Sequence, residues 1–468
     1  MKQFIAELTS SYEIFLKKSC AEKTNKKKQN RLLSFCSTFP KPFSKDDFSH
    51  FFNTSPEVFY SWEKNEEVLA VGNVHSLAAR GALRWKELEK QYIDFPEPFL
   101  NSAEPQFINL PLFLTAIKFN ANNQSDEWSN FKNSEFYIPQ FLVKFERHSS
   151  FFRFNVFVND NFSIENSVME FSSILQTISQ SISNKPTEKI IKYNRTDTPS
   201  NEKTVWKNRV EIALSEIRKS SVTKVVLARR ISLKTRKSFN IEDLLNRLKL
   251  KNLNAHVFCI KKNDSIFLGA SPEILLELRG NNILTEAIAG SRKRGGTAEE
   301  DVYLENELRN SEKEINEHRS VVDFITQELK SFALELHFSD VPKVKKLASI
   351  QHLSTEISAA LKNNAKIFSV VDKLFPTPAV CGYPKEKAMK LISELEDFDR
   401  GLYAGLIGWI SPTSAKLVVA IRSALINKNT IFVYAGCGIV EGSDPENEFA
   451  ETETKFKTIL STLNDKNQ

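Results

Sequence analysis

Glycine is scarce in this chain of 468 residues and lies almost entirely toward the C-terminus. Only 14 residues are glycine, about 3%, whereas soluble proteins average roughly 7%. Two glycines, Gly72 and Gly81, precede residue 269, and the other twelve lie between Gly269 and Gly442. Glycine is needed where the backbone takes a positive φ or approaches a ligand closely. The distribution predicts that the chemistry lies in the C-terminal half and that the N-terminal half is scaffold.

Cysteines and long apolar runs are also few. The five cysteines are odd in number, far apart in the chain and without a C-x-x-C pair. Neither a disulfide framework nor a zinc site follows from this pattern, which favours a reducing compartment. The N-terminus carries acidic residues and lacks the apolar core of a secretory signal. No apolar run approaches the ~20 residues of a membrane span. We expect a cytoplasmic protein with no membrane partner.

A large excess of one charge sign is missing as well. Subtracting 58 acidic from 64 basic residues leaves a net charge of +6, which is small for this length. The densest basic stretch, Lys17 to Arg31, has no interleaved aromatic residues and no pattern of base-reading side chains. A solvated helix end and polar loop explain it better than a nucleic-acid site does. We expect no nucleic-acid partner.

The chain divides into a phenylalanine-rich first part and a more regular second part. Length alone predicts two or three domains of roughly 100–200 residues. The polar stretch Asn184 to Lys203 is the best candidate linker. After it, strands and helices mix without βαβ regularity, which predicts an α+β layered architecture. The second part contains a long helical stretch from Ala298 to Phe332, an apolar strand from Leu417 to Ile426 and a final helix from Pro445 to Leu463.

Four carboxylates form two pairs at helical spacing. Glu314 and Glu317 lie in SEKEINEH, and Glu448 and Glu451 lie in DPENEFAET. Residues three apart share a helix face, so two such helices could build an all-oxygen site for a hard cation such as Mg²⁺. A solvated charged face is the more common reason for this spacing. Spacing alone leaves both explanations open.

The strand around Arg422 is apolar on both faces, which predicts that Arg422 is buried. A buried guanidinium requires an anion, and its fork suits a carboxylate. A structural ion pair is the alternative to a ligand. The next strand contains AGCGIV, where Gly436 and Gly438 leave backbone N–H groups able to receive an anion. Two anion-binding features on successive strands favour a carboxylate ligand.

Three further polar residues lie beside apolar strands. Lys224 opens KVVLAR, Glu273 follows a Gly-Ala-Ser-Pro turn, and His352 lies in QHLST. Each of these residues, taken alone, is more often structural than catalytic.

Nine motifs in a fixed order then identify a family. The order over residues 224–455 is KVVLAR, LGASPEILLEL, EAIAGSRKRG, SEKEINEH, HLST, FPTPAVCGYP, FDRGLYAGLIGW, VVAIRSALI and YAGCGIVEGSDPENEFAETETK. This series resembles the chorismate-utilising enzymes, and within them the isochorismate synthases, with anthranilate synthase component I and salicylate synthase as relatives. The resemblance implies one large α+β fold, a sandwich of two antiparallel sheets with helices outside, and a monomer. Residues 1–200 would be its variable N-terminal part and 201–465 its chorismate-binding catalytic core.

The resemblance also implies an activity, the Mg²⁺-dependent addition of water at C2 of chorismate with loss of the C4 hydroxyl. Lys224 takes the position of the family's general base, and a lysine there argues for water rather than ammonia as nucleophile. A base must be a neutral amine. Glu273 takes the position of the general acid, so its pKa should be raised.

The remaining site residues are implied in the same way. Glu317 and Glu451 match the direct metal ligands, and Glu314 and Glu448 match supporting carboxylates. The substrate-binding residues would be Gly290 and Ser291 at the ring carboxylate, Arg422, Gly436 and Gly438 at the enolpyruvyl carboxylate, and Lys455, His352 and Thr377.

The subtype follows from two motifs. The ammonia-using relatives carry a P-I-K-G-T type motif where this chain reads AIAGS (residues 287–291). Salicylate synthases tend to carry a hydroxyl residue where this chain has the apolar pair Ala379 and Val380. Isochorismate synthase is the favoured reading. The alternatives are a salicylate synthase and a non-catalytic chorismate-binding homologue, in which the basic segment Lys17 to Arg31 would bind a partner.

Overall fold

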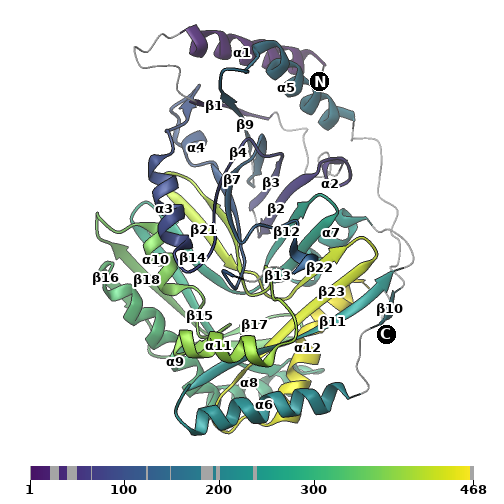
Figure 1. Ribbon diagram of the computed structural model, residues 1–468, viewed down its shortest axis with the longest axis vertical. Coiled ribbons are helices and arrows are strands. Elements are labelled where there is room, and N and C mark those ends of the chain that lie inside the picture. Colours follow the sequence, from purple (N-terminus) through teal and green to yellow (C-terminus); the bar gives the residue numbers. More distant parts are fainter. Residues whose placement is uncertain are drawn as a thin grey trace.

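Two large β-sheets dominate the structure (Figure 1). The computed structural model describes residues 2–21, 31–39, 50–64, 66–122, 125–147, 149–180, 193–196, 201–235 and 240–463. Most of the candidate linker (residues 184–203) and most of the basic stretch (residues 22–30) lie outside the described residues. The described part of that linker contributes strand β10 (Tyr193–Arg195).

In the described residues thirteen strands form the larger sheet, in the order β10-β11-β23-β22-β13-β12-β2-β3-β8-β9-β1-β5, with β19 beside β11. Its further strands are β11 (Lys224–Thr235), β23 (Thr430–Ile439), β22 (Ser423–Asn427), β13 (Ser265–Ser271), β12 (His256–Lys262), β2 (Glu57–Glu63), β3 (Glu66–Val71), β8 (Phe141–Phe145), β9 (Ser150–Val158), β1 (Arg31–Thr38), β5 (Phe99–Leu100) and β19 (Gly382–Tyr383).

Ten described strands form the smaller sheet, in the order β16-β18-β15-β14-β21-β20-β6-β7-β4, with β17 beside β18. They are β16 (Ala333–Phe338), β18 (Ile350–Leu361), β15 (Asn282–Lys293), β14 (Ile274–Arg279), β21 (Ser414–Val419), β20 (Leu406–Ile410), β6 (Phe113–Ile117), β7 (Ser134–Ile138), β4 (His75–Ala79) and β17 (Lys343–Lys346). The predicted α+β sandwich is confirmed. Its pairings are antiparallel except for β1 with β5, which run parallel.

Alternation along the strands places the larger sheet between two cores. In β12, Phe258 and Ile260 belong to the core shared with the smaller sheet, whereas Val257 and Cys259 belong to the core on the opposite face. Successive side chains point to opposite faces of a strand, so a strand that is apolar throughout is buried on both sides. Strands from before residue 200 extend both sheets.

Helices close the outer faces of the sandwich. The second core of the larger sheet contains side chains of α1, α5, α7 and α12, and α9 packs on β15 and β18 of the smaller sheet. Figure 1 shows α1 and α5 side by side at the end of the molecule opposite α6 and α8. The helices are α1 (Lys2–Ala21), α2 (His50–Thr54), α3 (Arg84–Asp94), α4 (Pro105–Ile108), α5 (Ile164–Gln180), α6 (Glu202–Arg218), α7 (Ile241–Lys251), α8 (Ala298–Asn310), α9 (Glu312–Lys330), α10 (Ile367–Leu374), α11 (Lys385–Leu395) and α12 (Pro445–Leu463). No helix in these described parts is long and apolar enough to cross a membrane.

Two predicted elements are divided in the structure. The helical stretch from Ala298 to Phe332 breaks at Ser311, whose side chain accepts a hydrogen bond from the Glu314 N–H and caps α9. This is a typical role of serine at a helix N-terminus. The break orients α9 independently of α8. The final helix, α12, has the predicted bounds.

The predicted strand from Leu417 to Ile426 is wrong as one continuous element. β21 ends at Val419 in the smaller sheet, and β22 begins at Ser423 in the larger one. Between them Arg422 takes a left-handed φ of +53°, a conformation that costs a non-glycine residue of order 1–3 kcal/mol. Arg422 therefore lies where the chain crosses between the two sheets and not in a regular alternating strand.

Candidate active site

A cavity forms where the two sheets meet α9 and α12. Its walls come from β11, β23, the turn after β13, β15, β18, the segment around residues 379–380 and the sheet crossing at Arg422. All of its lining residues lie between residues 226 and 455, as the glycine distribution predicted. Ten of the predicted site residues line it, namely Glu273, Gly290, Ser291, Glu317, His352, Arg422, Gly436, Gly438, Glu451 and Lys455.

Four predicted residues are not among those that line the cavity: Lys224, Glu314, Glu448 and Thr377. Thr377 was predicted to bind the substrate, but its side chain does not line the cavity. Its hydroxyl donates a hydrogen bond to Glu273 Oε1 at 3.2 Å, so it supports the carboxyl that lines the cavity. Lys224 and Glu314 are likewise bonded to residues of the wall, Glu317 and Ser291.

Glu273 is a buried carboxyl without a salt-bridge partner in the described residues. Burial raises the pKa of Glu273 to about 7, while the hydrogen bond from Thr377 and the charge of Lys224 lower it. Desolvation disfavours the charged form of a carboxyl. Near neutral pH a large part of Glu273 therefore carries a proton, which is what a general acid requires.

Lys224 begins β11 and is buried, with its ammonium 2.7 Å from Glu317 Oε1. Gly438, opposite Val226 on the neighbouring strand, makes room for this pair. A Cβ atom at position 438 would lie 2.6 Å from Glu317 Oε1 and 2.9 Å from Lys224 Cε. Glycine is needed here because two functional side chains approach the backbone, a reason that the sequence did not reveal.

Arg422 faces the cavity without a carboxylate partner. Its guanidinium donates a hydrogen bond to His352 Nε2 at 3.1 Å, and no described carboxylate lies within ion-pairing distance. Burial lowers the pKa of Arg422 to about 10, so it remains charged at neutral pH. The alternative of a structural ion pair is wrong for the described residues, and the positive charge is left for a ligand.

His352 is neutral, and its tautomer follows from its partners. Burial and the charges of Arg422 and Lys455 hold the pKa of His352 well below its usual range. Because a guanidinium can only donate, Nε2 must be the acceptor and Nδ1 carries the proton. Nδ1 then donates to the Ser291 hydroxyl, 2.9 Å away. His352 therefore links the arginine to the serine across the cavity.

The backbone of β23 turns two of its amides, those of Gly436 and Gly438, away from β11 at the cavity. The N–H groups of Val226 and Ala228, opposite Gly438 and Gly436, bond to Cys381 and Glu396 instead of β23. In an antiparallel ladder such pairs point their amides away from each other. The amides of Gly436 and Gly438 therefore point away from β11, past the end of β22. The Lys455 ammonium donates to the Gly436 carbonyl at 2.7 Å.

A bulge in β15 shapes the opposite wall. The register with β18 shifts between Ala289 and Ser291, and Gly290 between them has a φ of +76°. Glycine in this conformation is a usual device for re-aiming a strand. The bulge directs the Ser291 N–H to Glu314 Oε2 at 2.8 Å.

The four carboxylates come from two helices, α9 and α12, and Glu317 and Glu451 line this cavity. Each of the four has a cationic partner. Glu317 pairs with Lys224, Glu451 with Lys455 at 2.6 Å, Glu448 with Lys313 at 2.9 Å and Glu314 with Arg292 at 3.2 Å. Glu451 and Lys455 are four residues apart on α12, a spacing that places them on one helix face. A solvated face does not explain these residues, because Glu314 and Glu448 are buried.

The donor set fits a hard divalent cation in its chemistry. Burial and the charges of Glu317 and Glu451 raise the pKa of Glu314, and burial and Glu451 raise that of Glu448, so the carboxylates lie close enough to repel one another. Carboxylate oxygens are the ligands that Mg²⁺ prefers. In the part of the chain that the structure describes, however, no three His, Cys, Asp or Glu side chains converge closely enough to form a preformed metal site.

Sequence reasoning missed Tyr403. This buried tyrosine lines the cavity, and its hydroxyl lies 2.9 Å from where a Cβ atom of Gly436 would be. Burial raises the pKa of Tyr403 far above its usual range, so its O–H is a neutral donor beside Arg422. The only signal in the sequence was its place in the FDRGLYAGLIGW motif.

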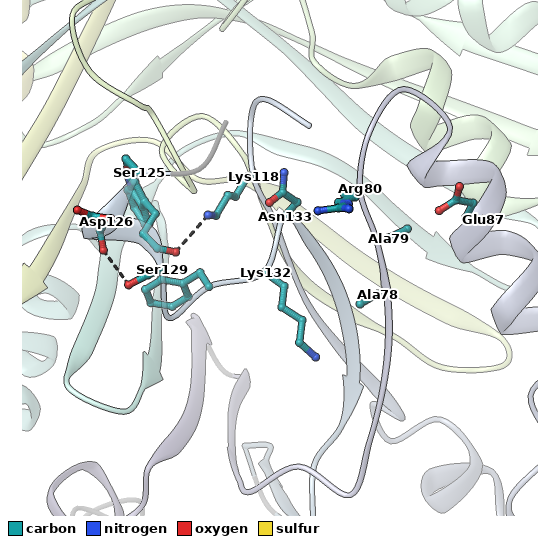
Figure 2. A pocket seen from close by; sticks show the side chains of 12 residues that line it. Ala78, Ala79, Arg80, Glu87, Lys118, Ser125, Asp126, Ser129, Lys132 and Asn133 are labelled. Atoms are coloured by element: carbon teal, nitrogen blue, oxygen red, sulfur yellow. Dashed lines mark hydrogen bonds between the residues drawn. The ribbon is translucent and has the colours of Figure 1, made fainter. Parts of the chain in front are cut away.

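A second hollow lies between β4, the end of β6 and residues 125–133 (Figure 2). Two of its three cations bond within the protein: the Lys118 ammonium donates to the Trp128 carbonyl at 3.1 Å, and Lys132 pairs with Glu135 at 2.7 Å. None of the predicted site residues lines it. The first cavity is therefore the candidate active site.

The family comparison shows which class of protein combines this two-sheet sandwich with this cavity. The chain matches the model of the chorismate binding enzymes over residues 16–464 and belongs to that family. It is 32% identical to the isochorismate synthase MenF of Bacillus subtilis over 386 residues, which are 81% of each chain. It is 38% identical to the salicylate biosynthesis isochorismate synthase of Pseudomonas aeruginosa over 270 residues, 57% of this chain and 56% of that one.

The solved structure of MenF, the menaquinone-specific isochorismate synthase from Escherichia coli, has the same fold. The match has a TM-score of 0.76 at 24% identity and covers 97% of this chain and 99% of that one.

Proposed function

We propose that this protein is an isochorismate synthase, which isomerises chorismate by adding water at C2 and releasing the C4 hydroxyl. The observation that carries the proposal is that one cavity is lined by Glu273, a carboxyl with a raised pKa, by Glu317 of the buried Lys224–Glu317 pair and by an arginine that lacks an anion. Relatives at 32% and 38% identity that are named isochorismate synthases support it.

Substrate binding would use the unpaired donors of the cavity. Arg422, the Tyr403 hydroxyl and the amides of Gly436 and Gly438 would hold the enolpyruvyl carboxylate. The Ser291 hydroxyl and the Gly290 backbone would hold the ring carboxylate. Preorganised donors in a buried cavity fix the substrate without reorganisation, which is the main electrostatic contribution to catalysis.

Proton transfer would use Lys224 and Glu273 as a complementary pair. Lys224 takes a proton from the attacking water, and Glu273 gives its proton to the departing C4 hydroxyl, so water is both consumed and released. To act as a base, Lys224 must be neutral and must release Glu317. In the reverse reaction the two residues exchange roles.

A Mg²⁺ ion is part of the proposal. Glu317 and Glu451 would hold it directly, with Glu314 and Glu448 in support, and it would supply positive charge against the ring carboxylate. Removal of the ion with EDTA should abolish turnover, and added Mg²⁺ should restore it.

A product assay tests the function. Purified protein is incubated with chorismate and Mg²⁺, and the products are separated by chromatography. We expect isochorismate alone. Salicylate with pyruvate would instead identify a salicylate synthase, and chorismate that binds without turnover would identify a non-catalytic homologue.

A further inference from the structure

The turn that carries Glu273 is fixed by hydrogen bonds on both sides. The Ser271 hydroxyl accepts from the Glu273 N–H at 3.1 Å and donates to the Val419 carbonyl at 2.6 Å. The Val419 N–H donates to the Glu273 carbonyl at 3.0 Å. The remaining carbonyl, that of Pro272, accepts from the Lys345 ammonium at 2.8 Å. Lys345 is therefore the only charged side chain, among the described residues, that is bonded to this turn.

Lys345 is itself held by a carboxylate. Its ammonium lies 2.6 Å from Glu286 Oε2, and the Ser354 hydroxyl donates to Glu286 Oε1. The three residues lie on the neighbouring strands β17, β15 and β18. Lys345 stands opposite His352, whose ring lines the cavity. Neither Lys345 nor Glu286 lines it. These hydrogen bonds connect three strands of the smaller sheet to the turn that carries Glu273.

We propose that Lys345 and Glu286 are positioning residues for the general acid of the reaction proposed above. Lys345 holds the Pro272 carbonyl and Glu286 holds Lys345, so that the carboxyl of Glu273 is presented to the cavity in one orientation. The inference rests on the proposed function. Neither residue touches the substrate, and both act through the turn.

The pair also has an electrostatic signature that a purely structural pair lacks. The charged groups facing Glu273 are Lys224 from β11, Glu286 from β15, Lys345 from β17 and Arg422 from the sheet crossing. The negative charge of Glu286 raises the pKa of Glu273, and the positive charge of Lys345 lowers it. Loss of Lys345 should therefore raise the pKa of Glu273, and loss of Glu286 should lower it. When both are lost, the two shifts should nearly cancel.

The test is the pH profile of kcat for Lys345→Met, Glu286→Gln and the double variant. In Lys345→Met we expect the alkaline limb to move up by roughly 0.5–1 pH unit, and in Glu286→Gln down by a similar amount. We expect kcat at the optimum to fall roughly tenfold in Lys345→Met with KM changed less than about twofold, because only the acid is misplaced. Lys345→Arg, which keeps the charge and the bond to Pro272, should restore kcat. Limbs that stay in place or move in the same direction would overturn the proposal.

Matched controls lie on the same strands. Lys343→Met on β17 and Glu356→Gln on β18 remove exposed charges with no described partner, and both should keep the wild-type profile. Circular dichroism verifies that each variant is folded.

A measurement without turnover separates this inference from the proposed function. Infrared difference spectroscopy of the free protein follows the protonated-carboxyl band that disappears in Glu273→Gln. If wild type does not convert chorismate but the band titrates at shifted pH in opposite directions in the two variants, the proposed function is wrong, whereas the coupling of Lys345 and Glu286 to Glu273 stands. If wild type converts chorismate and the band titrates unchanged in both variants, the positioning role is wrong.

Discussion

The phenylalanine-rich N-terminal region and the C-terminal region, which holds most of the glycines, bury different kinds of side chain. Residues 1–200 contain 24 of the 36 phenylalanines and two of the 14 glycines. There, Phe171 packs within 4.6–6.1 Å, ring centroid to centroid, of four aromatic rings, and Tyr12 bonds to Ser167. In the cavity, by contrast, Arg422 and Glu273 are buried and neither has a salt-bridge partner among the described residues. The comparison teaches that stability and reactivity are built in different parts of one sandwich, because charges left unpaired for a substrate cost stability.

The largest effects should come from the acid and the base. Lys224→Ala and Glu273→Gln should each lower kcat by about 10²–10⁴-fold, the usual contribution of a positioned proton-transfer group, with the fold retained. Lys234→Ala, which removes an exposed lysine from the same strand as Lys224, is the matched control. Steady-state kinetics measure the loss, and near-normal turnover in either variant would contradict the assigned roles.

The opposite pattern is expected from the N-terminal aromatic core. Phe171→Ala should lower the free energy of unfolding by about 3–5 kcal/mol, because it opens a cavity in close-packed rings. The kcat of the remaining folded enzyme should be unchanged. Urea denaturation measures the first value and steady-state kinetics the second. Met169→Ala, exposed on the same helix, should change stability by less than about 0.5 kcal/mol. A loss of kcat in folded Phe171→Ala would break the division between the two regions.

Arg422→Lys should affect binding more than either chemistry or stability. A lysine keeps the charge but loses the two-pronged hydrogen bonding of the guanidinium, so KM should rise roughly 10–100-fold while kcat falls less. The free energy of unfolding should not decrease, since no described carboxylate depends on Arg422. An unchanged KM would show that the carboxylate of the substrate binds elsewhere.

The pH dependence of the free energy of unfolding should also differ between the two regions. The pKa of Glu273 is raised in the folded protein from 4.5 to about 7, so the folded state holds a proton that the unfolded state releases. Stability from this proton is fully present below pH 4.5 and is lost as pH rises through about 7. Turnover that needs the protonated acid should fall over the same upper range. Urea denaturation at pH 5 and pH 8 should show Glu273→Gln gaining stability over wild type at the higher pH, whereas the difference between Phe171→Ala and wild type should not depend on pH.

Much of the site could be predicted from motifs, but its contacts could not. Ten of the residues that the ordered motifs singled out line one cavity. Alternation failed at Arg422, because the apolar run is shared by strands of two different sheets. Apolar patterning reports burial and does not report which sheet buries a residue.

The sequence by itself determined where the chemistry lies, since glycine and the ordered motifs are properties of the chain that need no partner. It also determined the local helix geometry of the carboxylate pairs. Only the tertiary structure decided why Gly438 must be glycine, why Arg422 lacks an anion and how Lys345 reaches the turn of Glu273. These are contacts between residues far apart in the chain, and burial and charge at such contacts depend on how the two sheets pack.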